Sequence, residues 1–353
     1  MYLIIDGSSM LSTNYYGTLP FSVLTAKTDE EKAKHFKEIM QTKDGVYTNG
    51  VFSSLRNILN IINDQQPEGI AVCLDASRDT FRRELYSDYK AQRGGTPSPL
   101  KEQFNTFNKI LNEIGIPTFY STRFEADDLA GSLARKIESL GGTCAVMSAD
   151  KDYYQLVTSN TKFWRIIPSP AQPKYKKLYG INFSQYVKDN NLPKGVFEIT
   201  EDTGIIADKE IIHLTPEQFI DYLSVVGDKV DNIPGVQSVG PKSIVPLLQE
   251  YGTLSDIYSA IQEAMDEGTM KQLADDFKEI GVKKSTINAL MDHKDEADLS
   301  RLLAQINCSC PVPNDLESYK LNINKDGLAE VINRYEFKSL EKFIDEEMEL
   351  ERE

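Results

Sequence analysis

The sequence contains few of the residues that usually bind zinc or form disulfide bonds. Its 353 residues include only four cysteines and three histidines, and the histidines are expected to be surface or packing residues. The closest cysteine pair, Cys308 and Cys310, has no second ligand pair beside it. A zinc site is therefore not indicated, and we expect an intracellular, reducing compartment.

Long hydrophobic runs and an excess of positive charge are also missing. The apolar runs are short, such as Tyr2–Ile5, well below the ~20 residues that span a bilayer. The N-terminus lacks the order of a secretory signal, and no membrane association is expected. The 39 basic and 54 acidic residues give a net charge of −15, which alone argues against a nucleic-acid partner. A concentration of acids in a metal site and in the tail would weaken that argument.

Three apolar runs each end at an aspartate. They lead into Asp6, Asp75 and Asp150. Helical patterns lie between them, at residues 49–63, 98–114 and 126–140. Alternating strands and helices predict an α/β fold with a mostly parallel sheet flanked by helices. Because the carboxyl ends of parallel strands share one edge, we expect the three aspartates to meet there.

Three more carboxylates, Glu125, Asp127 and Asp128, stand at the head of the helix expected at 126–140. Acidic residues in a first turn are favoured by the helix dipole, so capping is one explanation. Alternatively, they join the strand-end aspartates. Carboxylates crowded in one cleft repel each other, and divalent cations resolve that conflict. Oxygen ligands select Mg²⁺ or Mn²⁺ over zinc.

Residues 225–244 contain two further aspartates, Asp228 and Asp231, followed by a glycine-rich turn between two helical patterns. Such a turn can present backbone N–H groups at a helix N-terminus, where they bind phosphate without reading bases. Lys242 would add a point charge there. A plain connection between helices is the alternative.

Residues 78–101 reverse the sign of the local charge. They hold six basic and three acidic residues, a net charge of +3, with Tyr86 and Tyr89 interleaved. Basic and aromatic residues together suit a surface that follows a single strand and stacks its bases. A solvated helix face is the alternative. Residues about 18–44 and 170–212 look like insertions, and the sequence assigns them no role.

Six segments in this order resemble the 5′-nuclease (flap endonuclease) superfamily. The segments are Asp6–Ser9, Leu74–Asp75 with Phe81–Arg82, Tyr89–Arg93, Phe124–Asp128, Ala149–Asp152 and Gly227–Gly235. The resemblance is strongest to the 5′→3′ exonuclease domain of bacterial DNA polymerase I and to stand-alone bacterial and phage relatives. The chain is too short to include a polymerase, so a stand-alone nuclease is expected.

The resemblance implies an architecture. It consists of a PIN-like core with a mixed, mostly parallel sheet, a helical arch and a C-terminal helix-hairpin-helix module. The implied regions are a catalytic core at 1–170 with its arch at about 78–101, an insertion or linker at 171–212, a helical DNA-binding region at 213–340 and an acidic tail at 341–353.

The resemblance also implies the site residues. The metal ligands would be Asp6, Asp75, Glu125, Asp127, Asp128, Asp150, Asp152, Asp228 and Asp231. Catalysis would rest chiefly on Lys90, Asp6, Asp75, Asp128 and Asp150. DNA contacts would come from Arg78, Arg82, Tyr89, Lys90, Arg93, Gly235, Val236, Gly240, Lys242 and Ser243. The expected cofactors are two or more Mg²⁺ ions, with Mn²⁺ as a substitute, and K⁺ at the hairpin.

The implied function is a structure-specific 5′ nuclease that uses two metal ions in DNA replication or repair. Its expected partners are DNA with 5′ flaps, nicks or RNA-primed ends, and other replication proteins. A monomer in the cytoplasm of a bacterial cell or a phage-infected host cell is expected. The main alternative is a non-catalytic DNA-junction binding protein of the same fold. An RNA-cutting toxin-like nuclease and a small-molecule phosphatase are less consistent with the motifs.

Overall fold

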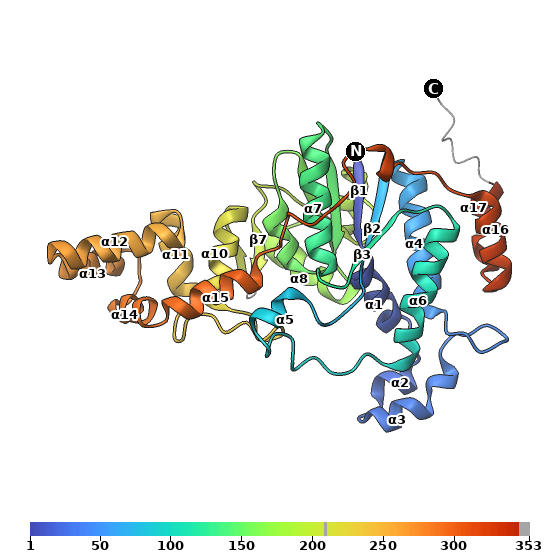
Figure 1. Ribbon diagram of the computed structural model, residues 1–353, viewed down its shortest axis with the longest axis horizontal. Coiled ribbons are helices and arrows are strands. Elements are labelled where there is room, and N and C mark those ends of the chain that lie inside the picture. Colours follow the sequence, from blue (N-terminus) through green and yellow to red (C-terminus); the bar gives the residue numbers. More distant parts are fainter. Residues whose placement is uncertain (208–209, 346–353) are drawn as a thin grey trace.

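A six-stranded sheet forms the centre of the molecule in the computed structural model, which describes residues 1–207 and 210–345 (Figure 1). The strand order is β3-β2-β1-β4-β5-β6, with the first five strands parallel and β6 antiparallel to β5. The strands are β1 (Tyr2–Asp6), β2 (Gly69–Asp75), β3 (Thr118–Ser121), β4 (Cys144–Ser148), β5 (Thr161–Ile166) and β6 (Val196–Ile199). The predicted mixed, mostly parallel sheet is confirmed.

Both faces of the sheet are covered, which explains why its central strands are apolar without alternation. In β1, Leu3 and Ile5 pack into one hydrophobic core, and Ile4 packs into the other. The first core is covered by helices α1 (Gly7–Gly17), α4 (Asn49–Gln65), α6 (Ser98–Glu113) and α16 (Lys325–Arg334). The second core includes helix α7 (Ala126–Ser139). The helices expected at 49–63, 98–114 and 126–140 are thereby confirmed.

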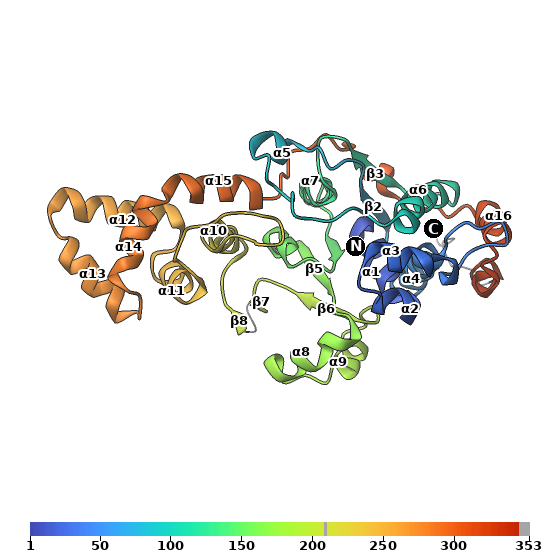
Figure 2. The same cartoon turned by 90° about the horizontal axis from the view of Figure 1, so that it is seen from below.

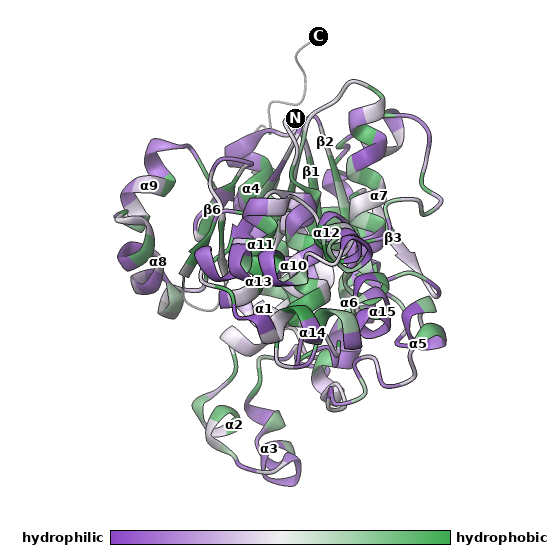
Figure 3. Ribbon diagram, turned by 90° about the vertical axis from the view of Figure 1, so that its left-hand side faces the viewer, coloured by the Kyte–Doolittle hydropathy of each residue, from purple (hydrophilic) through white to green (hydrophobic). Residues whose placement is uncertain are grey.

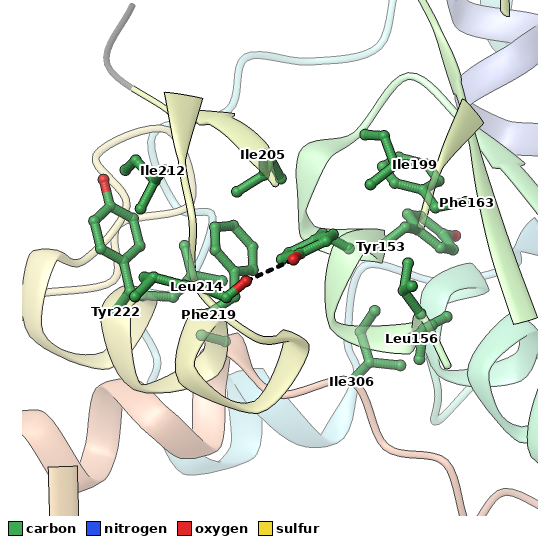
Figure 4. Close-up of a cluster of buried hydrophobic side chains, with 14 of the residues drawn as sticks. Tyr153, Leu156, Phe163, Ile199, Ile205, Ile212, Leu214, Phe219, Tyr222 and Ile306 are labelled. Atoms are coloured by element: carbon green, nitrogen blue, oxygen red, sulfur yellow. Dashed lines mark hydrogen bonds between the residues drawn. The ribbon is translucent and has the colours of Figure 1, made fainter. Parts of the chain in front are cut away.

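A lobe of helices extends from one side of the sheet (Figure 1). It consists of α10 (Pro216–Val226), α11 (Pro241–Tyr251), α12 (Leu254–Glu267), α13 (Met270–Glu279), α14 (Lys284–Asp292) and α15 (Lys294–Ala304). Figure 4 shows how it joins the core: Phe219 of the lobe belongs to the same buried cluster as Tyr153 and Phe163. The Tyr154 hydroxyl donates a hydrogen bond of 2.6 Å to the carbonyl oxygen of Leu214.

The remaining elements are short. The helices are α2 (Phe21–Thr25), α3 (Asp29–Lys34), α5 (Phe81–Leu85), α8 (Gln172–Tyr179), α9 (Phe183–Asp189) and α17 (Lys342–Asp345). The 3-10 helices are η1 (Phe36–Glu38), η2 (Lys151–Leu156), η3 (Ser169–Ala171), η4 (Glu317–Tyr319) and η5 (Lys338–Leu340), and a small ribbon pairs β7 (Ile205–Ala207) with β8 (Glu210–Ile212). No helix in the described part of the chain is long and apolar enough to cross a membrane.

The structure differs from the expected regional boundaries in two places. Strand β6 lies inside the segment expected as an insertion, yet it pairs with β5 and completes the sheet. The chain also returns from the helical lobe to the core before its end, where Phe337 packs 5.2 Å from the ring of Phe52. The cause is hydrophobic: Leu328 and Phe337 complete the core beneath α4 and α6. Most of the expected acidic tail, from residue 346 on, lies outside the described residues.

Candidate functional site

Three aspartates lie at one edge of the sheet, as expected from parallel strands. Asp6 ends β1, Asp75 ends β2, and Asp150 follows β4 by two residues. Ser148 donates a hydrogen bond of 2.8 Å to Oδ2 of Asp6, and the backbone N–H of Ser9 donates one of 2.9 Å to Oδ1. Asp6, at the end of β1, is therefore held in place by Ser148 of β4 and by the first turn of α1.

The carboxylates at this edge affect one another's charge. Burial raises the pKa of Asp6 to about 7, and the charges of Asp75 and Asp150 add to this effect. After burial itself, Asp6, Asp75 and Asp127 also raise the pKa of the Cys73 thiol, so all three lie within range of one buried group. Asp6, Asp75 and Asp150 form no ion pair within the described residues. The ion pairs of the site are formed by its other carboxylates.

The head of α7 adds its acidic residues to the same edge. Oδ1 of Asp75 accepts a hydrogen bond of 2.9 Å from the backbone N–H of Ala126, which ties β2 to the start of α7. The backbone N–H of Glu125 donates one of 3.0 Å to Oδ2 of Asp128. Burial raises the pKa of Asp127 well above its usual range, although Arg82 partly opposes this. Capping therefore accounts for Asp128, whereas Asp127 is held at the site with an unfavourable charge.

Arg82 and Asp128 form a buried ion pair that joins three segments of the chain. Their side chains are 1% and 0% exposed, and the guanidinium makes two hydrogen bonds of 2.7 and 2.8 Å to the two carboxylate oxygens. Arg82 also donates to the carbonyl oxygens of Leu303 and Gln305, both at 2.9 Å. Asp128 accepts a further hydrogen bond of 2.8 Å from the backbone N–H of Asn307. The pair thus fastens α5, α7 and the end of α15 together.

Lys90 lies between two of the predicted metal ligands. Its Nζ atom is 2.8 Å from Oε2 of Glu125 and 3.8 Å from Oδ2 of Asp231. Burial alone would raise the pKa of Glu125, but Lys90 and Arg82 outweigh it and lower that pKa. The Tyr89 hydroxyl donates to the same Oε2 atom at 3.1 Å. Glu125 is therefore ionised and held by three donors.

Lys151 has the same arrangement on the other side of the site. Its Nζ atom is 3.0 Å from Oδ1 of Asp152 and 3.2 Å from Oδ2 of Asp228. Burial raises the pKa of Asp152 to about 6, and Asp150 also raises it, while Lys151 opposes this shift. Burial would raise the pKa of Asp228 too, but Lys151 outweighs it and lowers that pKa.

The loop that carries Lys90 is docked on the loop that carries Asp231. The backbone N–H of Lys90 donates a hydrogen bond of 2.9 Å to the carbonyl oxygen of Asp231. The Asn232 amide donates one of 2.8 Å to the carbonyl of Asp88 and accepts one of 3.2 Å from Gln92. Lys90 and Asn232 both have left-handed backbones, with φ of 54° and 57°. Asparagine tolerates this conformation, whereas lysine takes it at a cost, so the docking holds Lys90 in place.

The predicted hairpin joins α10 to α11 and is tightly folded. A Cβ atom on Gly227 would lie 2.5 Å from the carbonyl oxygen of Ile233, so only glycine fits this turn. The backbone N–H of Gly235 donates a hydrogen bond of 2.9 Å to the Ser300 hydroxyl of α15. Lys242, in the first turn of α11, is exposed. The hairpin therefore presents one cation beside a helix N-terminus.

Four of the predicted site residues are buried instead of facing a ligand. Asp128 receives two hydrogen bonds on each carboxylate oxygen, which leaves none free for a metal ion. The Arg82 side chain is buried and its guanidinium is bonded within the protein, so it does not reach DNA in this arrangement. Tyr89 is 3% exposed and bonded to Glu125, so it cannot stack on a base. The backbone N–H of Val236 donates a hydrogen bond of 2.7 Å to the carbonyl oxygen of Val225, and its side chain packs in the hydrophobic core. These four expectations are replaced by structural roles.

The other predicted DNA contacts lie at or near the surface. Arg78, Arg93 and Lys242 are exposed, and Gly240 and Ser243 are partly exposed. Arg78 donates to the Gly94 carbonyl and the Thr96 hydroxyl, both at 3.0 Å, and Arg93 pairs with Asp231. Gly235 is buried within the hairpin. Their contacts with DNA stay predictions.

Two residues of the site were missed by the sequence reasoning. Lys151 stands inside the Asp-Lys-Asp run, and Asn232 directly follows Asp231. Their positions between aspartates were a signal, because a cation or an amide is needed where carboxylates crowd together. Nothing in the sequence, however, indicates that Lys151 reaches Asp228, 77 residues away.

The donor set at the sheet edge fits a hard divalent cation. Asp6, Asp75 and Asp150 offer carboxylate oxygens there, and Asp75 and Asp150 are exposed and without a counter-ion among the described residues. No group of three or more aspartate, glutamate, histidine or cysteine side chains in the described ranges is spaced to hold one ion as it stands.

Comparisons with known proteins identify the family of this chain. A family model described as 5′-3′ exonuclease, N-terminal resolvase-like domain, matches residues 1–182. A second, described as 5′-3′ exonuclease, C-terminal SAM fold, matches residues 214–326. The chain is also similar in fold to T5 5′-exonuclease bound to divalent metal ions (zinc), with 19% identity, a TM-score of 0.54 and coverage of 98% of this chain and 100% of that one.

Two curated relatives give the same picture. The chain is 30% identical over 315 residues to DNA polymerase I of Streptococcus pneumoniae serotype 4, covering 89% of this chain and 29% of the polymerase. It is 27% identical over 322 residues to a 5′-3′ exonuclease of Aquifex aeolicus, covering 86% of this chain and 94% of that protein. The chain thus spans less than a third of the polymerase relative. With family models matching both its catalytic core and its helical lobe, the chain belongs to the 5′-3′ exonuclease family.

Proposed function

We propose that this protein is a divalent-metal-dependent 5′ nuclease, acting as a 5′→3′ exonuclease and flap endonuclease. It hydrolyses phosphodiester bonds of DNA, and of RNA primers, at 5′ ends, flaps and nicks in replication or repair. One observation carries the proposal: Asp6, Asp75 and Asp150 lie at one edge of the sheet, and none of them has a counter-ion among the described residues. Family membership supports the same activity.

Asp6, Asp75, Asp127 and Asp150 would hold the ions, two or more Mg²⁺ with Mn²⁺ as a substitute. Divalent ions bound there supply a more acidic water molecule and stabilise charge on the phosphate and the leaving oxygen. Four other carboxylates are more closely paired with a lysine or arginine than Asp127, which is 4.0 Å from Arg82, so they would contribute more weakly; they are Glu125, Asp152, Asp228 and Asp231.

Lys90 supplies positive charge where the phosphate becomes more negative in the transition state. Its position is fixed by Glu125 and by the docking of its loop on Asp231, so little reorganisation is needed at the moment of reaction. Burial of Asp6 and Glu125 limits water at the inner end of the site. Water is the attacking group in this proposal, because divalent ions bound at the site would make it more acidic.

The DNA would follow the phosphate-binding groups on either side of the site. Exposed Lys242 at the start of α11, with Gly240 and Ser243, would hold the duplex, and Arg78 and Arg93 the strand near the arch. These groups contact backbone phosphates, so the protein would show little sequence preference and a steep loss of affinity with salt. K⁺ at the hairpin, other replication proteins as partners, a monomeric state and a cytoplasmic location stay predictions.

The test is a 5′-flap duplex labelled at its 3′ end, incubated with the protein in Mg²⁺, in Mn²⁺ or in EDTA. We expect metal-dependent products that end at or near the junction. A flap duplex lacking a free 5′ end is the matched substrate control and should be cut more slowly. Tight binding with no cleavage in either metal would overturn the proposal and identify a non-catalytic junction-binding protein.

A further inference from the structure

Strand β5 and the segment that joins it to β6 have a charge opposite to that of the chain. Residues 161–195 contain seven basic residues and one acidic residue, a net charge of +6 in a chain of net charge −15. The basic residues are Lys162, Arg165, Lys174, Lys176, Lys177, Lys188 and Lys194. The first family model ends at residue 182 and the second begins at residue 214, so Lys188 and Lys194 lie in the gap between them, and the other five basic residues lie in the last part of the first. The site described above uses none of these residues.

The topology places this segment next to the site. Helices α8 and α9 leave the carboxyl end of β5 and return to antiparallel β6, so they stand at the sheet edge that carries Asp6 and Asp75. Figure 2 shows α8 and α9 on one side of this edge and α5 on the other. A nucleic acid held at the site by the arch side would therefore have α8 and α9 on its opposite flank.

The segment is anchored firmly enough to present its charges in fixed positions. Tyr175 and Tyr179, one turn apart on α8, both pack on Phe197 of β6, with ring centroids 5.4 and 4.7 Å away. Phe183 of α9 packs edge-on against Tyr175 at 6.2 Å. The aromatic face of α8 is thus buried against β6 and α9.

The exposed surface of α8 carries lysines that have no counter-ion among the described residues. Lys174, Lys176 and Lys177 are exposed, as are Lys188 and Lys194 beyond them. Within residues 1–207 and 210–345, none of the five forms an ion pair, whereas Lys90 and Lys151 each contact two carboxylates. Figure 3 shows α8 and α9 at the rim of the molecule, away from the helical lobe. These five lysines are called the α8–α9 surface below.

We propose that the α8–α9 surface binds the phosphate backbone of the nucleic acid that occupies the site. The proposal rests on the proposed nuclease function and extends its substrate contacts to a second flank. An anionic membrane fits less well, because membrane-bound amphipathic helices need a free apolar face and that of α8 is buried. Unpaired lysines beside a site that acts on a polyanion fit a phosphate backbone directly.

The test is the salt dependence of binding, measured by fluorescence anisotropy in EDTA so that no cleavage occurs. The probes are a labelled 5′-flap duplex and a single strand of the flap sequence. The variant Lys174→Glu/Lys176→Glu/Lys177→Glu should bind at least tenfold more weakly. The plot of log K against log salt should become shallower by up to about 2.7 for duplex or about 2.1 for single strand, the values for three phosphate contacts. If the salt slope changes more for the flap duplex than for the single strand, α8 contacts the duplex. The reverse result means that α8 contacts the single strand.

A matched control separates local contacts from the change in net charge. Lys320→Glu/Lys325→Glu/Lys338→Glu changes the charge by the same amount on exposed residues of the segment that returns to the core. It should leave the salt slope unchanged. Because glutamates in the last turn of α8 oppose its dipole, Lys174→Gln/Lys176→Gln/Lys177→Gln is tested as well. It should reproduce the shallower slope with unaltered circular dichroism.

The outcomes distinguish this proposal from the proposed function. If the unmodified protein cuts the flap and the α8 variants keep its salt slope, the α8–α9 surface proposal is overturned while the nuclease stands. If the unmodified protein neither binds nor cuts DNA, both fail. A third arm uses vesicles of phosphatidylglycerol and phosphatidylcholine. Vesicle binding lost in the variants, with DNA binding unchanged, would overturn the proposal in favour of a membrane.

Discussion

Two groups of carboxylates in the site differ in what neutralises them. Asp6, Asp75 and Asp150 stand at the strand ends without a counter-ion among the described residues, and burial raises the pKa of Asp6 to about 7. Glu125 and Asp128, at the head of α7, are instead paired with Lys90 and Arg82. The carboxylates of the first group are available to bind a cation, whereas those of the second group form ion pairs that join segments of the chain.

Neighbours in one motif can therefore have different roles. Asp127 and Asp128 are adjacent, yet the Asp127 side chain is 27% exposed and 4.0 Å from Arg82, whereas that of Asp128 is 0% exposed. A helix turns about 100° per residue, so consecutive side chains point in different directions. One of them faces the strand-end aspartates, and the other faces the interior.

The largest effect is expected from removing the buried arginine, Arg82, because this should lower the free energy of unfolding. Arg82→Met leaves Asp128 ionised without its partner, and the loss of one partner of a buried pair costs about 3–5 kcal/mol. The three segments that Arg82 joins should loosen together. Urea unfolding should show a lower midpoint with little change in slope.

A double variant tests whether this loss belongs to the pair. Asp128→Asn alone should also destabilise the protein by several kcal/mol, because it strands the Arg82 charge. In Arg82→Met/Asp128→Asn neither charge remains, so the double loss should be well below the sum of the single losses. Losses that simply add would show that Arg82 and Asp128 act separately.

The buried pair of Arg82 and Asp128 could not be predicted from the sequence, whereas the strand-end aspartates could. The strands ending in Asp6, Asp75 and Asp150 followed from short-range patterns, and parallel topology brought their ends together. The partner of Arg82 lies 46 residues away in the chain, and its carbonyl acceptors lie more than 220 residues away. Hydrophobic periodicity carries no information about such contacts. The family resemblance placed Arg82 among the DNA contacts, and a basic residue in a basic segment usually faces solvent.

The next largest effect should come from the lysine that joins the two groups. Lys90→Ala removes one preorganised charge near the phosphate, which typically lowers kcat by about 10²–10³. DNA affinity should change far less, because Lys90 is one of several cations along the path. Single-turnover cleavage of the flap duplex, with affinity measured separately, resolves the two quantities. An unchanged turnover would remove Lys90 from the mechanism and leave it as a counter-ion of Glu125.

A smaller effect is expected on the affinity for the metal itself. Asp75→Asn keeps an acceptor for the Ala126 N–H but removes the charge, so Mn²⁺ affinity should fall on the order of 10–100-fold. Asp128→Asn, in protein that is still folded, should leave the number of bound Mn²⁺ ions unchanged. Calorimetric titration with Mn²⁺ measures both variants. A lost ion in Asp128→Asn would mean that its carboxylate rotates out of the ion pair, and the division between the two groups would fail.

The smallest effect is expected from Arg83, the neighbour of Arg82. Arg83 pairs with Asp79 at 3.2 Å, but the Asp79 side chain is 89% exposed and Arg83 is partly exposed. Exposed pairs of this spacing contribute about 0.3–0.5 kcal/mol, so Arg83→Met should shift the urea midpoint only slightly. The two substitutions remove the same charge from consecutive residues of α5. Because only Arg82 is desolvated and bonded to three segments, burial accounts for the predicted difference. A loss in Arg83→Met comparable to that in Arg82→Met would show instead that the positive charge of α5 as a whole, and not the buried pair, stabilises the site.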